Sequence, residues 1–106
     1  MEFKIDISLD NDYFFFYDKV YEDWQRNFPK STPPSHTDAV ELFCSTEVDI
    51  ICWILENSKT ASICWPNVIS ITRNIFRKEP LYVHVNITDV NEAMMFKLLW
   101  NDNLVD

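Results

Sequence analysis

The 106-residue sequence contains no glycine. Glycine normally supplies the positive-φ positions of tight turns and helix C-termini, so those positions must be taken by Asn or Asp, or be avoided. A sandwich of tight β-hairpins is therefore unfavourable. Gly-rich phosphate-binding loops are ruled out, and with them nucleotide sites of the Walker and Rossmann types.

A leader segment and a long apolar run are also missing. The N-terminus has no basic stretch followed by an apolar one, and the chain nowhere approaches the ~18 apolar residues needed to span a bilayer. We therefore expect a cytoplasmic protein without membrane association. Three cysteines, an odd number, predict reduced and mostly buried thiols in that compartment, and their spacing matches no zinc motif.

Positive charge is scarce in the first half of the chain. The net charge of −8 arises entirely in residues 1–58, which hold twelve Asp and Glu against four Lys and Arg, whereas residues 59–106 hold five of each. Such asymmetry is typical of a protein with one face that meets a basic partner. Nine basic residues against seventeen acidic ones argue against direct binding of nucleic acid.

The spacing of apolar residues predicts one domain, residues 1–106, of mixed α and β structure. Alternation predicts strands at 2–9 and 81–87, with a possible short strand at 60–65. Spacings of three and four predict helices at 12–27, 38–57, 66–78 and 89–100. A break near Ser45 and Thr46 divides the second of these into two.

The fold expected from these elements is α+β, or a small α/β fold, with two to three short strands in a small sheet covered by four to five helices. Prolines make the segment 29–37 a non-helical loop. Asp38 with Glu41, and Asp89 with Glu92, resemble capping boxes that start helices. A strand that returns through a helix usually runs parallel to the first, so we expect parallel pairing.

Five consecutive aromatic residues, 13–17, lie in the first predicted helix. Each residue turns a helix by about 100°, so Phe14 and Phe15 fall on outer faces when the apolar stripe points inward. That stripe consists of Tyr13, Tyr17, Val20, Trp24 and Phe28. Exposed aromatics among acids are typical of an interface anchor. Two alternatives stay open: other helices could cover this one on two sides, or residues 13–17 could form a strand.

Acidic residues accompany these aromatics with little interleaved lysine. Asp18 and Glu22 stand four residues apart, where like charges destabilise a helix by ~0.2–0.5 kcal/mol. A basic partner would explain this arrangement, and a merely solvated face is the alternative. The residues predicted to bind a partner are Asp12, Phe14, Phe15, Asp18, Tyr21, Glu22, Asp23, Glu41, Glu47 and Asp49.

No catalytic residue, metal ligand or cofactor is predicted. His36 lies in the proline-rich loop and His84 on a predicted strand, and neither stands at a recognisable distance from a Ser or Cys nucleophile. A Cys–His pair formed only in space stays open, because such sites are defined by geometry. The cations at 73, 77 and 78 suit the C-terminal end of a helix.

The short chain, the one-sided charge and the segments Asn11–Asp18 and Tyr21–Trp24 together resemble the small acidic immunity proteins of bacterial toxin systems, including those of contact-dependent growth inhibition. The resemblance implies a stoichiometric inhibitor that binds a cognate toxin, often a nuclease, and blocks its basic cleft. The alternatives are an acidic nucleic-acid mimic that blocks a host defence protein, a homodimeric adaptor module and a small enzyme. The oligomeric state is left open.

Overall fold

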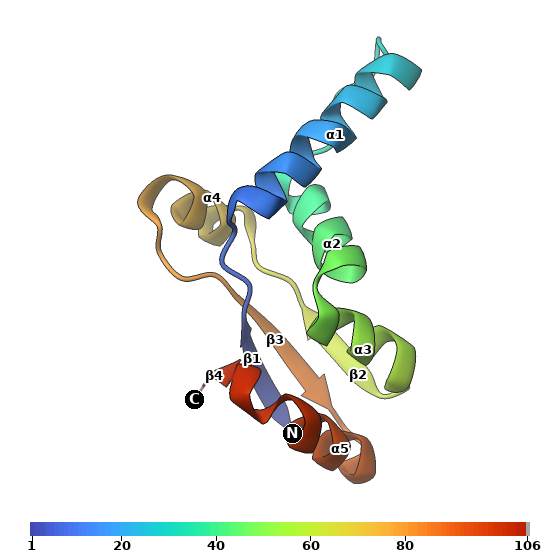
Figure 1. Cartoon of the computed structure of the whole chain (residues 1–106), viewed down its shortest axis with the longest axis vertical. Coiled ribbons are helices and arrows are strands. Elements are labelled where there is room, and N and C mark those ends of the chain that lie inside the picture. Colours follow the sequence, from blue (N-terminus) through green and yellow to red (C-terminus); the bar gives the residue numbers. More distant parts are fainter. Residues whose placement is uncertain (106) are drawn as a thin grey trace.

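The computed structural model describes residues 1–105, in which five α-helices and four strands confirm the expected α+β class (Figure 1). The sheet has one strand more than the two to three expected. In chain order the elements are β1 (Glu2–Asp6), α1 (Asn11–Asn27), α2 (His36–Glu47), α3 (Asp49–Asn57), β2 (Ala61–Cys64), α4 (Val68–Arg77), β3 (Tyr82–Ile87), α5 (Val90–Trp100), a 3₁₀ turn (Asn101–Asn103) and β4 (Leu104–Val105).

The strand order is β2-β3-β1-β4, and all neighbouring strands are antiparallel. The expected parallel pairing is therefore wrong. β1 and β2 do run in the same direction, but β3 lies between them, and β1 separates β3 from β4 in the same way. This is a split βαβ arrangement, in which the helical connection sets the direction of the returning strand without making it a neighbour. β4 was not predicted, because two residues are too short to show alternation.

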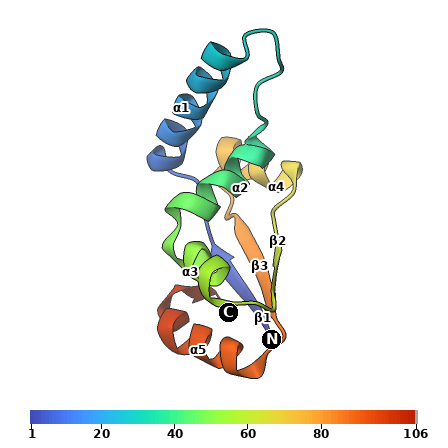
Figure 2. The ribbon, with the colours of Figure 1, turned by 90° about the vertical axis from the view of Figure 1, so that its right-hand side faces the viewer.

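Only one face of the sheet is buried, as the alternation in β1 and β3 predicts. Phe3 and Ile5 of β1 stand opposite Val85 and Val83 of β3, and all four side chains are buried. Helices α3 and α5 lie on this face, while the other face is bare (Figure 2). Phe96 of α5 packs edge-on against Phe3, with ring centroids 4.8 Å apart.

Polar side chains cap the starts of α1, α2, α4 and α5, whereas α3 has no side-chain cap. The carboxylate of Asp10 accepts hydrogen bonds from the backbone N–H groups of Asp12 and Tyr13 (3.0 and 3.4 Å), so α1 begins where a start was expected. α2 begins at His36, inside the segment predicted as loop, because Ser35 and not Asp38 provides the cap.

Two further helix boundaries also shift. The break between α2 and α3 falls at Val48 rather than near Ser45 and Thr46. α4 follows an Asn67 cap, whose side chain accepts the Ser70 N–H at 2.8 Å, so Pro66 precedes the helix instead of starting it.

The predicted cap of α5 is confirmed at Asp89, which accepts the N–H of Glu92 at 2.9 Å. Glu92 does not complete the reciprocal capping box. Its carboxylate accepts hydrogen bonds from the Lys59 N–H (2.6 Å) and the Thr60 hydroxyl (2.8 Å), which lower its pKa, the Lys59 bond most. The turn before β2 is thereby tied to α5.

α4 ends at Lys78, which has a left-handed backbone with φ of 56°. In a chain without glycine we expected such a position to be taken by Asn or Asp or to be avoided, and lysine occupies it instead. The buried amide of Asn74 fixes the surrounding turn, because its oxygen accepts the Leu9 N–H (3.0 Å) and its nitrogen donates to the Glu79 carbonyl (2.6 Å). Neighbouring contacts thus hold Lys78 in a conformation that lysine disfavours.

Replacing Lys78 by glycine should therefore raise the free energy of unfolding by about 0.5–1 kcal/mol, because glycine adopts positive φ without steric cost. Lys97→Gly is the matched control, since Lys97 lies within α5 and its replacement should lower stability by about 1 kcal/mol. Urea unfolding of the three proteins measures both changes. A Lys78→Gly variant no more stable than the original would contradict the expected cost at this position.

Candidate protein-binding site

Helix α1 projects from the body of the molecule (Figure 1). Tyr13 fixes the base of this helix against α2. Tyr13 is fully buried, with its ring 5.5 Å from that of Phe43 and its hydroxyl hydrogen-bonded to His36 Nδ1 at 2.7 Å. Burial, and then the neighbouring Tyr17 and Cys44, raise the pKa of Tyr13. Tyr17 stacks on the His36 ring at 4.1 Å. These contacts confirm the inward direction of the predicted stripe at Tyr13 and Tyr17, whereas Phe28 at its far end is 52% exposed. The helix excludes the alternative of a strand at 13–17.

A groove of about 380 Å³ lies between α1 and α2. The rings of Phe16 and Phe43, 5.3 Å apart, contribute apolar surface to it, and Phe15 stands beside them with 69% of its surface exposed. Its lining consists of Asp12, Phe15, Phe16, Lys19, Phe43 and Glu47. We call this feature the α1–α2 groove.

Three of the predicted binding residues, Asp12, Phe15 and Glu47, meet in the α1–α2 groove. Phe14 does not join them. It is 37% exposed, packs edge-on against Tyr13 with centroids 5.4 Å apart, and lines a different hollow between the start of α1 and α4. The two phenylalanines therefore cannot anchor a partner in the same hollow.

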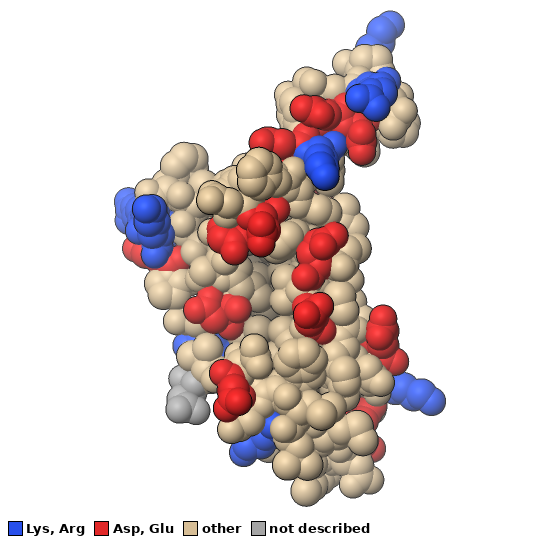
Figure 3. Space-filling view, viewed as in Figure 1, with Lys and Arg blue, Asp and Glu red and all other residues tan. Residues whose placement is uncertain are grey.

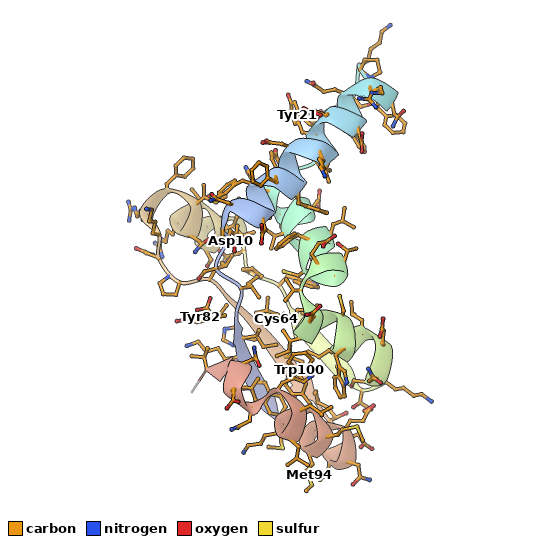
Figure 4. The ribbon with its side chains drawn as sticks, viewed as in Figure 1. Asp10, Tyr21, Cys64, Tyr82, Met94 and Trp100 are labelled. Atoms are coloured by element: carbon orange, nitrogen blue, oxygen red, sulfur yellow. The ribbon has the colours of Figure 1, made fainter. Side chains whose placement is uncertain are left out.

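The other predicted residues lie outside the groove. Asp18, Glu22 and Asp23 are exposed farther along α1. Tyr21, also on α1, is half-buried, and its hydroxyl accepts a hydrogen bond from Gln25 at 3.0 Å (Figure 4). Glu41 is half-buried on α2, and Asp49 is exposed as the first residue of α3.

Phe16, Lys19 and Phe43 line the groove but were not predicted as site residues. Phe43 lies in the predicted helix 38–57, and the sequence carries no signal that it would meet α1. Lys19 could have been found, because positions 12, 15, 16 and 19 follow the spacing of one helical face.

Helix dipoles explain some of the acidic residues and not others. Asp12 and Asp49 lie in the first turns of α1 and α3, where negative charge is favourable. Glu47 ends α2 and Glu56 lies in the last turn of α3, where negative charge is unfavourable, and neither last turn contains a basic residue. The stability of the monomer therefore gives no reason for the negative charges of Glu47 and Glu56.

The acids of α3 and of the end of α2 act on one thiol. Burial, followed by the charges of Asp49, Glu56 and Glu47, raises the pKa of Cys52. Acidic side chains continue from α1 over α2 and α3 on the face seen in Figure 3. The acidic side chains on this face are separated by uncharged surface, and the groove itself also contains Lys19.

The cysteines are free thiols. Only Cys44 is fully buried and Cys64 is exposed, so the expectation that most of the thiols are buried is wrong. Burial and the nearby Cys52 raise the pKa of Cys44 to about 12. Cys64 stands directly opposite His84 across β2 and β3, and both side chains are exposed on the bare face of the sheet. Cys64 and Tyr82 are labelled on that sheet in Figure 4.

Within residues 1–105, no group of three or more His, Cys, Asp and Glu side chains is arranged to hold a metal ion.

No family model, curated protein or solved structure matches this chain. None of the helices among the described residues is long and apolar enough to cross a membrane.

The contact between His36 and α1 predicts a pH effect on stability. Burial lowers the pKa of His36 below its ordinary value of 6.5, so the folded protein favours the neutral ring more than the unfolded chain does. This contribution is fully present above about pH 6.5 and is lost as the pH falls through the lowered pKa. The free energy of unfolding should therefore decrease between about pH 7.5 and pH 5.5.

His36→Phe is the matched variant, because it keeps an aromatic ring beside Tyr17 but cannot titrate. Urea unfolding across that pH range should show a smaller decrease for His36→Phe than for the original protein. Equal decreases would assign the effect to other groups.

Proposed function

We propose that this chain is a stoichiometric inhibitor that binds a basic protein, such as a toxin nuclease, through the α1–α2 groove and the acids of α3. The proposal includes a cytoplasmic location and no catalytic role. The observation that carries it is Phe15, a large aromatic side chain that is 69% exposed in a groove whose two rims carry Asp12 and Glu47. Aromatic anchors surrounded by polar groups are typical of the residues that dominate binding energy.

The charge distribution supports a basic partner. A nuclease holds phosphates with basic side chains, so an acidic face can occupy the same cleft and be steered towards it over a distance. The acidic side chains of α2 and α3 include Glu47 and Glu56, whose positions at the C-terminal ends of helices destabilise the free monomer. A cationic partner would offset that cost.

The acidic nucleic-acid mimic uses the same face and differs only in its target. A toxin gene beside this one would favour the inhibitor, whereas a phage operon would favour the mimic. A homodimer formed through α1 is less favoured, because it would bring two like-charged faces together.

Site-specific cross-linking in the native cell tests the proposal. A photoreactive phenylalanine analogue replaces Phe15 in one protein and Ser62, on the bare face of the sheet, in another. We expect the first alone to capture a basic protein, whose activity is blocked at a 1:1 ratio. Association should slow between ~0.05 and ~0.5 M salt, where the screening length falls from about 14 Å to about 4 Å. Capture at both positions, or a rate independent of salt, would contradict the proposal.

Phe15→Ala should weaken binding of that captured protein by about 2 kcal/mol, or roughly 30-fold in Kd, and leave the melting temperature almost unchanged. Leu42→Ala is the matched control, since Leu42 is a 48% exposed side chain on α2 that does not line the groove. Its affinity should equal that of the original protein. If Phe15→Ala unfolded the protein, or bound as tightly as the original, Phe15 would not be the anchor.

A further inference from the structure

Helix α5 is apolar on all sides, although only one side is covered. Eight of its eleven residues are apolar. Ala93 and Phe96 are buried against the sheet. The outward side chains, which are 55–82% exposed, are Val90, Met94, Met95, Leu98 and Leu99. A helix that is apolar all round is normally buried, so this surface, which we call the α5 patch, is typical of an interface.

The α5 patch has a shape that a side chain can enter. Met94, Lys97, Leu98 and Asn101 surround a hollow of about 370 Å³, and its walls are mainly apolar. Met94 points away from the sheet at this end of the molecule (Figure 4). Leu98 is the most exposed residue of the patch, at 82%.

Charge indicates which partner the patch can accept. Residues 59–106 carry no net charge, and α5 lies at the end of the 47 Å long axis opposite to α1 (Figures 1 and 3). The acidic faces of two copies would therefore stay far apart if the copies met through α5. A strongly acidic or basic partner would meet few opposite charges here, because Lys97 is the one charged residue around the hollow.

The size of the α5 patch also suits two copies. Its five exposed side chains offer on the order of 500 Å² per copy, so a symmetric pair would bury about 1,000 Å², near the lower limit for a specific interface. In a two-fold dimer the same patch serves both partners, so no second complementary surface is needed. The expected affinity is micromolar rather than nanomolar.

We propose that the α5 patch binds a second copy of this chain, so that the α5 helices of two copies pack about a two-fold axis with Met94 and Leu98 at its centre. The interface differs from the α1–α2 groove and leaves that groove open at both ends of the dimer. It does not depend on the inhibitor function.

Sedimentation velocity of the purified chain at about 5 to 500 μM tests this proposal. A reversible monomer–dimer equilibrium is expected, and Leu98→Glu should weaken it at least tenfold without changing the melting temperature, since Leu98 is so exposed in the monomer. Leu42→Glu is the control and should dimerise like the original protein. A wild-type protein that stays monomeric up to 500 μM would overturn the proposal, and the α5 patch would then have to bind a different molecule.

The same experiment distinguishes other modes of association. Phe15→Asp should leave the dimer intact if α5 is the interface. A dimer abolished by Phe15→Asp and retained by Leu98→Glu would place the contact in the groove and overturn the proposal. Aggregates without a defined dimer would do the same.

Discussion

One face of the sheet must be covered, and this constraint sets the positions of α3 and α5. Phe3 and Ile5 of β1 and their partners on β3 cannot face water, so α3 and α5 pack against them. These two helices fill the covered face, and α1 is left outside it. Tyr13 then becomes the residue that attaches α1, because it is the only fully buried side chain in that helix. The α1–α2 groove lies beside this attachment, where Phe16 of α1 meets Phe43 of α2.

The sequence predicted most of the elements because their signals are local. Alternation in β1 and β3 and the cap at Asp89 are each decided within a few residues of chain. Strand order could not be predicted, because it depends on which strand is inserted between two others. β4 could not be predicted either, since pairing with β1 and not its own two residues defines it. Lys78 was missed for a similar reason: tertiary contacts of Asn74 override the local preference.

The residue types of the candidate site could be predicted from the sequence, but the shape of the site could not. Acids and aromatics identified α1, and the helical period correctly put Phe14 and Phe15 outside the buried stripe. The same period could not show that these two side chains face different hollows, because α4 bounds one and α2 the other. Nor could it bring Glu47 to Asp12, which lie 35 positions apart in sequence. Such meetings depend on how helices cross.

The brevity of the outer strands affects how the chain behaves at high concentration. Edge strands present unpaired N–H and C=O groups that can recruit another chain and start aggregation. Here the two edges are β2, with four residues, and β4, with two. Pro66 follows β2 closely and cannot donate a hydrogen bond to an added strand. The molecule therefore offers little template for fibril growth, even though its apolar helices expose side chains that favour association.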